Sequence, residues 1–531
     1  MTTATTDPHV ELHPEGFFVE TPEASFKPFA SGDDDPSTAL APGEPVVMKS
    51  RPAIVFFVEM FMANLLQVLL PPLNTYIYGS YLHGSAAHVA QIASLQAGAW
   101  TLRVFFAILI DIVPVFGYRR KFWLVAGWLV TIGALLSMAC RSFGDPYCDP
   151  KDHPGCATAL NPNGSFYNLD APNSVPWFRT PIFFLMLGIM IVQATLDGVL
   201  IEYAQRDPIS TRGIFQGFTY FFQGIGAVWG RLFLQLFLNS RRYGGYYDWS
   251  AGPNTPYFVA IFFSLCAFVP AIALFRDTKN HIKSVPEWFG QLWTLLQNRA
   301  VYQLLAFRFL TNLFQSPTGP TVVTWVKHLD LGWANVIPRV PYIPTIILTT
   351  KKGRSWNWQK ALFIATLVGI LLTAFPVLFV VWDVCRNDYF YIILFALAIV
   401  STGMNTLIPG WALVEVAGVG HEATIAAIFA TIKDLNVPLT TRWRTYMAES
   451  YPANLALLND SHTQNQVGYN WLICLGIQLV GLAFIFLIPS HRQPLLAMKQ
   501  ASKGSMIGGA LVIAGYIALF VVDWQQNFKD Y

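Results

Sequence analysis

The segment D-I-V-P-V-F-G-Y-R-R-K (Asp111–Lys121) lies between two long apolar stretches and places a carboxylate and three cations between them. Gly117 permits a tight reversal of the chain, and Pro114 ends the helix expected before it. Lysine and arginine are retained on the cytosolic side of membrane proteins. The segment therefore predicts a short cytosolic turn between two membrane-spanning helices, with Asp111 paired to Arg119 or Arg120 as a gating or structural ion pair.

The composition is typical of an integral membrane protein. Of the 531 residues, 54% are hydrophobic and 12% are charged, whereas soluble domains carry about 25% charged residues. The mean hydropathy of +0.42 over this length also favours a membrane protein over a large soluble core. A net charge of +3 gives no reason to expect a nucleic-acid partner. We expect membrane lipids as partners instead.

The first fifty residues differ from the rest of the chain. They contain nine acidic side chains and two lysines, with recurrent proline and no apolar period. Such a segment cannot bury enough apolar surface to offset the entropy lost on ordering. It also lacks the basic-then-apolar pattern of a cleaved signal peptide. We therefore expect 1–50 to be a disordered, acidic, cytosolic tail.

Thirteen apolar windows approach the length of about 20 residues that a helix needs to cross a bilayer. The window 333–350 is weak because it holds three prolines and Arg339, and 506–522 is short and separate. An arginine in mid-membrane costs about 2.5–3.5 kcal/mol on insertion scales. The thirteen windows are 54–73, 88–110, 122–140, 181–202, 213–238, 257–275, 301–326, 333–350, 361–382, 389–412, 421–440, 469–489 and 506–522.

The positive charges favour a cytosolic N-terminus. With that topology 18 lysines and arginines fall in cytosolic segments and 10 in outer ones, the direction that the positive-inside rule requires. The weak window 333–350 is needed, because without it the cationic cluster 351–360 would face outward. Two acceptor sequences for N-glycosylation, at Asn163 and Asn459, fall in outer loops. The protein is then a multi-pass glycoprotein of the plasma membrane or an internal membrane.

Three cysteines cluster at the first long outer loop. Cys148 and Cys156 can pair if the loop faces an oxidising compartment, although Cys140 competes with them. The sequence has no C-x-x-C and no Cys/His ligand spacing, so we expect neither a structural zinc nor another metal or cofactor.

A second cationic, glycine-containing turn, 351–360, follows the first one six windows later. The recurrence suggests two six-helix halves, and internal repeats of that kind are typical of transporters. The predicted organisation is a first bundle at 51–275, a cytosolic linker at 276–300, a second bundle at 301–490, and a basic linker with an extra apolar segment at 491–531. The predicted fold class is all-α, a polytopic membrane protein with major-facilitator-like 6+6 helix bundles and an additional C-terminal helix.

Several motifs resemble one family. The Asp111–Lys121 turn is similar to the signature turn of the major facilitator superfamily, and its particular form resembles the folate–biopterin transporter branch. D-G-V-L-I-E (197–202), followed by Arg212-Gly213, resembles that branch's fourth span and following turn. G-H-E-A-T (420–424), leading to D-L-N (434–436), resembles its eleventh span. The resemblance covers about 51–490; it implies secondary transport of folate or biopterin, coupled to protons as a symport, by a protein expected to be monomeric.

Charged and polar side chains inside the spans are candidate substrate contacts, because burying them in lipid is costly. Glu59, Asn64 and Gln67 can share one face of the first span. At the cytosolic ends we expect Glu202 and Arg212 to pair. For four of the candidates (Glu59, Arg103, Asp197 and Arg308) a cavity contact and an internal ion pair stay equally open. The substrate-binding candidates are Glu59, Asn64, Gln67, Arg103, Asp197, Arg308, Asn312 and Lys433; the gating or structural candidates are Asp111, Gly117, Arg119, Arg120, Lys121, Glu202 and Arg212.

These residue types suit a pterin or folate. A carboxylate can accept paired hydrogen bonds from the amino edge of a pterin ring, and aromatic side chains can stack on its face. Arg103, Arg308 or Lys433 can pair with the carboxylates of a folate tail. A desolvated Glu59 or Asp197 can carry a symported proton.

Other functions stay open to different degrees. The chain has no H-E-x-x-H, G-x-S-x-G or phosphate-binding loop motif, so we do not expect an enzyme. Transport of another small polar organic solute remains an alternative. A transport-incompetent receptor or scaffold is a further one, because the proline-rich window 333–350 departs from a regular twelve-helix plan.

Overall fold

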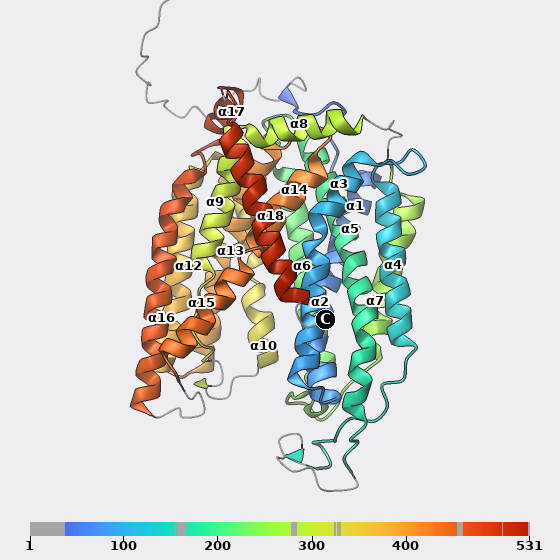
Figure 1. Cartoon of the computed structure of the whole chain (residues 1–531), viewed down its shortest axis with the longest axis vertical. Helices are drawn as coiled ribbons and strands as arrows, with labels where there is room; N and C mark the ends of the chain where they lie inside the picture. Colours follow the sequence, from blue (N-terminus) through green and yellow to red (C-terminus); the bar gives the residue numbers. More distant parts are fainter. Residues whose placement is uncertain are drawn as a thin grey trace, which may run out of the picture.

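The computed structural model describes residues 38–153, 155–156, 166–277, 284–322, 325–326, 331–453, 460–501 and 503–528. Long helices run side by side through the molecule, and helix α8 (Val285–Gln297) crosses one end of them (Figure 1). The loop that holds Cys148 and Cys156 projects from the opposite end. We name these the α8 end and the loop end.

The first bundle is built from the chain between Arg51 and Ala273. Its second span is broken at Leu102, where α2 passes into α3, and most of its buried apolar residues form one continuous core. The helices are α1 (Arg51–Leu69) with η2 (Asn74–Tyr81), α2 (Ala86–Thr101), α3 (Arg103–Ile112), α4 (Lys121–Ala139), η4 (Ala171–Phe178), α5 (Arg179–Gln205), α6 (Ile214–Phe237), η5 (Arg241–Tyr243) and α7 (Thr255–Ala273).

The second bundle has its own core, which also takes in Ile112, Ile201 and Ala204 of the first bundle at the α8 end. Its helices are α9 (Arg299–Gln315), α10 (Leu331–Val336), η7 (Ile337–Arg339), α11 (Tyr342–Lys352), η8 (Gly353–Ser355), α12 (Trp358–Val381), α13 (Asp388–Val416), α14 (Glu422–Asp434), α15 (Val437–Ser450), α16 (Ser461–Gly481) and η9 (Leu482–Leu487). α17 (Arg492–Ala501) follows, and α18 (Met506–Phe528) then lies diagonally across both bundles, packed against α2, α8, α9 and α15 (Figure 1).

Within the described residues, nine helical segments are long and apolar enough to cross a membrane. The extra C-terminal segment is one of them, as a single helix over Met506–Gln526. Four of the thirteen expected windows form helices outside this set. α9, α11 and α14 are short, and α6 carries three glutamines and Arg231. The window 333–350 is a broken helix because its prolines interrupt the backbone hydrogen bonds.

Glycines allow α6 to lie directly against α1. A side chain at Gly226 would place its Cβ 2.5 Å from the carbonyl oxygen of Phe61, and one at Gly230 would lie 2.9 Å from that of Leu65. Only hydrogen fits at these positions. The G-x-x-x-G spacing in the fifth span therefore marks close helix approach, as such motifs do in membranes.

The Asp111–Lys121 segment is the tight turn that its sequence predicts. Gly117 has a φ of 82°, in the left-handed region that glycine adopts without strain. Val115 and Tyr118 exchange two backbone hydrogen bonds, of 3.1 and 3.0 Å, which close the turn. The arginines that follow are thereby held next to Asp111, at the α8 end.

Candidate functional site

A buried ion-pair cluster, the Asp111 cluster, joins the two bundles at the α8 end. Asp111 accepts hydrogen bonds from the backbone nitrogen and the hydroxyl of Thr424 at 2.7 and 2.8 Å, at the start of α14. Arg120 lies 2.9 Å from Asp111 and 3.0 Å from Glu422, and Arg119 also pairs with Glu422. Asp111 therefore pairs with Arg120, as expected, while most other bonds of the cluster cross between the bundles.

A second buried cluster, the Glu415 cluster, lies at the same end. Glu415, at the end of α13, is fully buried and lies 2.9 Å from Arg212 of the first bundle and 2.6 Å from Arg492 of α17. The side chain of Gln205 also donates to the carbonyl oxygens of Val414 and Ala417, at 3.1 and 2.9 Å. At the α8 end the two bundles are therefore joined by polar contacts as well as by apolar packing.

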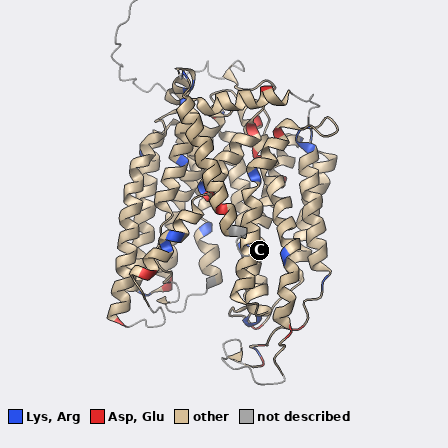
Figure 2. Cartoon of the chain, in the orientation of Figure 1, with Lys and Arg blue, Asp and Glu red and all other residues tan. Residues whose placement is uncertain are grey.

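The pairing of Glu202 with Arg212 is a wrong expectation. Glu202 pairs with Arg206 one helical turn away, and its carboxylate lies 3.7 Å from Arg119. Arg212 comes directly before Gly213, whose left-handed backbone starts α6, and reaches across to Glu415 instead. Glu415 was missed because the expected window ended at 412, although an acidic residue at the end of a long apolar stretch is a visible signal. Figure 2 shows acidic and basic positions close together below α8, with others further along the bundles and at the loop end.

A smaller group of charges lies between the bundles within the spans. Arg103 of α3 forms an ion pair with Asp197 of α5, and Gln193 donates to the same carboxylate at 3.0 Å. Across the interface, Lys433 lies 3.7 Å from Asp434 on α14. α14 packs against α3 and α5, so the two ion pairs lie on facing helices of the two bundles.

The candidates on α9 lie on the second-bundle side of this group. Asn312 donates to the carbonyl oxygen of Lys433 at 2.8 Å. Arg308 lies over the ring of Phe429 at 5.1 Å, and its contact with the carbonyl oxygen of Asn405 is long, at 3.5 Å. Since that contact is weak, the guanidinium of Arg308 keeps donors for a further partner.

The three candidates on α1 are not brought together. Glu59 is fully buried inside the first bundle, where it accepts a 2.7 Å hydrogen bond from the indole of Trp128. Asn64 faces α6 and donates to the carbonyl oxygen of Gln223 at 2.6 Å. Gln67 is half-buried and lines neither site. Of the three, only Asn64 reaches the space between the bundles.

A cavity of about 200 Å³ lies at that position and is shared by both bundles. Two of the side chains that line it are arginines, Arg231 of α6 and Arg339 of η7, and no described Asp or Glu forms an ion pair with either. Neither was among the candidate site residues, although each is a lone cation within an apolar window. The cavity is lined by Asn64, Val68, Gln223, Gly224, Ala227, Arg231, Arg339, Tyr342 and Thr402.

Cys148 and Cys156 form a disulfide with an S–S distance of 2.07 Å in the loop that projects from the loop end, and Cys140 is free and exposed. Asn163 and Asn459 lie outside the described residues. Within the described residues, no group of three or more His, Cys, Asp or Glu side chains could hold a metal ion.

Comparison with known proteins gives the class of this fold. A bacterial homologue of the iron transporter ferroportin, solved in an outward-facing state, is similar with a TM-score of 0.54 at 12% identity over 83% of this chain and 99% of that one. The same protein soaked with iron gives a TM-score of 0.52 at 12% identity over the same shares. FucP, a major facilitator superfamily transporter in the outward conformation, gives a TM-score of 0.48 at 12% identity over 81% of this chain and 96% of that one. That TM-score is too low to support a shared fold.

The expected all-α polytopic membrane fold is confirmed by the nine helical segments of the described residues that are long and apolar enough to cross a membrane, and by the likeness to the fold of the ferroportin homologue. No protein-family model matches the chain. No curated protein matches its sequence either. At 12% identity the likeness defines the fold, and the choice of substrate depends on this chain's own residues.

Proposed function

We propose that the protein is a secondary active transporter that moves a small polar organic solute across a membrane by alternating access. The observation that carries the proposal is the pair of ion-pair clusters at the α8 end. Glu422 and Glu415 each bind arginines of the other bundle there. Such contacts separate when two bundles rock apart, and rocking around a central site is how transporters of this architecture work.

The orientation and organisation follow from the sequence. The α8 end is cytosolic, since it carries the cationic turns at Asp111–Lys121 and 351–360. The bundles span 51–275 and 301–490, and the protein acts as a monomer in the plasma membrane or an internal membrane. Asn163 and Asn459 are then available for glycosylation on the outer side.

The proposed substrate is folate, biopterin or a related pterin. The support is the family resemblance of the motifs together with the cavity that Arg231 and Arg339 line. Guanidinium groups bind carboxylates in paired hydrogen bonds, and the ring of Tyr342 offers a stacking face. At about 200 Å³ the cavity is smaller than usual ligand pockets of about 300–1,000 Å³. The substrate-bound state then requires the bundles to separate further around it.

Proton coupling is assigned to Asp197. In the substrate-free state its carboxylate is neutralised by Arg103. Protonation of Asp197 would free the guanidinium of Arg103 to pair with a carboxylate of the substrate. With folate, whose tail carries carboxylates, a proton and the anionic substrate would then cross together, with the buried charge of the group unchanged.

The test is uptake of labelled folate and biopterin by the purified protein in liposomes. We expect uptake above that of empty liposomes and faster uptake with an inward proton gradient. Asp197→Asn should lose the dependence on the gradient, whereas Asp383→Asn, at an exposed ion pair within the second bundle, should keep it. Uptake equal to empty liposomes across pterins, nucleosides and amino acids would reject transport and favour a receptor or scaffold. Uptake of another solute class would reject only the substrate.

A further inference from the structure

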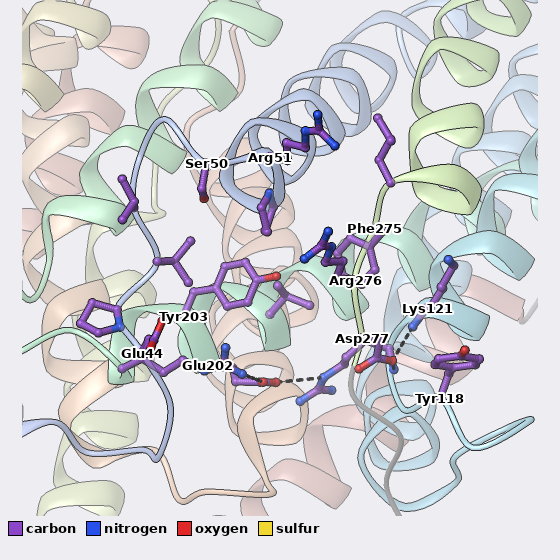
Figure 3. Close-up of a pocket in the computed structure, with 18 of the residues that line it drawn as sticks. Glu44, Ser50, Arg51, Tyr118, Lys121, Glu202, Tyr203, Phe275, Arg276 and Asp277 are labelled. Carbon is purple, nitrogen blue, oxygen red and sulfur yellow. Dashed lines mark hydrogen bonds and ion pairs between the residues drawn. The ribbon is translucent and has the colours of Figure 1, made fainter.

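A separate pocket of about 820 Å³ lies within the first bundle at the α8 end. Four segments form its walls: the chain before and at the start of α1, the turn before α4, the last turns of α5 and the end of α7. Figure 3 shows Arg51, Lys121, Tyr203 and Arg276 among its lining side chains. The pocket borders the Asp111 cluster, because Arg120 belongs to both.

Among the described residues, the pocket carries an excess of positive charge. Five cationic side chains line it against three acidic ones, Glu44, Glu202 and Asp277. Glu202 pairs with Arg206. The carboxylate of Asp277 accepts hydrogen bonds from the backbone nitrogens of Arg120 and Lys121, at 2.7 and 3.0 Å. The cationic residues are Arg51, Arg120, Lys121, Arg206 and Arg276.

Three of those cations are left for a ligand. The side chains of Arg51, Lys121 and Arg276 form no ion pair with any described carboxylate, and they come from three different segments of the wall. Glu44 is exposed, at the pocket's edge. Cations gathered from separate elements around one hollow bind phosphate groups well, because arginine offers a planar fork of donors and lysine a compact charge.

The pocket also borders the surface that faces lipid. The outer face of α7 is apolar and exposed, with Phe262 61% and Val269 59% accessible. Leu274, at the end of the same helix, is 48% accessible and forms part of the pocket wall. A molecule in the pocket could therefore place a charged group among the cations and an acyl chain along α7. Basic pockets between helices on the cytosolic side suit phosphorylated lipid headgroups.

We propose that this pocket binds a phosphorylated anionic group, held by Arg51, Lys121 and Arg276, and that its source is a lipid headgroup of the leaflet at the α8 end. The same phosphate chemistry is offered by a soluble inositol polyphosphate. The bound group lies against the backbone of the Arg119–Lys121 turn. Its occupancy therefore also stabilises the turn that holds the Asp111 cluster together.

The test measures binding to the purified full-length protein at 150 mM salt, which screens weak surface attraction. The probes are short-chain phosphatidylinositol 4,5-bisphosphate, short-chain phosphatidylcholine and soluble inositol trisphosphate. We expect saturable binding of the bisphosphate lipid, none of phosphatidylcholine, and a rise in melting temperature on binding. Arg276→Gln should weaken binding tenfold or more, and Lys121→Arg should retain it. Lys352→Gln, an exposed cation at the same end of the second bundle, is the matched control and should leave binding unchanged.

The comparison of lipid with inositol trisphosphate identifies the source of the bound phosphate group, and the comparison of variants tests the site itself. Lipid binding much tighter than that of inositol trisphosphate supports the headgroup, whereas equal binding supports the site with a soluble occupant. Absence of binding by the unmodified protein would overturn the proposal. Equal weakening by Arg276→Gln and Lys352→Gln would also overturn it, since binding would then follow total charge. A loss in Arg276→Gln counts only if its melting temperature without ligand matches that of the unmodified protein.

Discussion

Removing the charge of Glu422 should open the α8 end. Glutamine has nearly the same shape and can still accept the 2.8 Å hydrogen bond from the backbone nitrogen of Gly420. What is lost is the negative charge that faces Arg119 and Arg120 across the interface. Arg120 and Glu422 are nearly enclosed, since each has only 2% of its side chain accessible.

The magnitude follows from the neighbours that remain. Breaking a buried ion pair by removing one partner costs about 3–5 kcal/mol. Arg120 keeps Asp111 at 2.9 Å, and Arg119 keeps Glu202 at 3.7 Å, so the loss should lie at the lower bound, about 3 kcal/mol. Since about 1.4 kcal/mol is tenfold, the closed arrangement should weaken by roughly 100-fold. A closed population of about 99:1 would then fall to about 1:1.

The assay is the distance between spin labels at Thr211 and Lys352. Both are exposed, and the two loops touch where Arg354 donates to the carbonyl oxygen of Ser210. The chain has six cysteines, of which Cys148 and Cys156 form the disulfide; the others are replaced by serine. The unmodified protein should give mainly a short distance, and Glu422→Gln a second, longer population of similar size.

The control is Asp248→Asn, which removes an exposed ion pair with Arg241 in the first bundle. Such pairs contribute about 1 kcal/mol or less, so its distance distribution should match that of the unmodified protein. If Glu422→Gln gives the same single short distance, the Asp111 cluster does not hold the end closed. The transport mechanism built on it would then be wrong.

Three further outcomes are expected. Burial raises the pKa of Asp207 to about 7, although the positive charge of Arg212 acts in the opposite direction. The closed arrangement of the α8 end should therefore gain stability as pH falls from about 7 towards 4, and lose that stability as pH rises through about 7. Asp207→Asn should remove the dependence of the spin-label distances on pH. Gly226→Leu should lower the melting temperature strongly, because its Cβ would meet the Phe61 carbonyl oxygen, whereas Gly133→Leu, in open space, should not. Arg339→Gln should raise the KM for an anionic substrate more than it lowers the maximal rate, and an unchanged KM would remove Arg339 from the site.

Local sequence patterns predicted the helices and the Asp111–Lys121 turn, because apolar length, proline and glycine act within a few residues. The same signals are weaker where a span is irregular. The prolines near Arg339 disfavour one continuous helix there, and the segment is divided into α10, η7 and α11. The apolar window expected for α13 also ended too early, at 412, whereas the helix continues to Val416 and includes Glu415.

The partners of charged side chains were harder to predict than their positions. Glu202 and Arg212 are close in sequence, and yet Arg212 binds Glu415, about 200 residues further along. Glu59 and Asn64 both lie on the first span, but one is bound by Trp128 inside the bundle and the other faces the interface. These choices depend on how helices from distant segments pack, and no local pattern contains that information.

The diagonal course of α18 affects how far the bundles can move. Its Asp523 accepts a 2.7 Å hydrogen bond from Thr101 of the first bundle, while the same helix packs against α9 and α15 of the second. A rotation of one half relative to the other must therefore slide along this last helix or release it on one side. α18 thus limits how far the two bundles can rotate relative to each other. A bulky fusion placed after Phe528 would therefore disturb the contacts between the bundles.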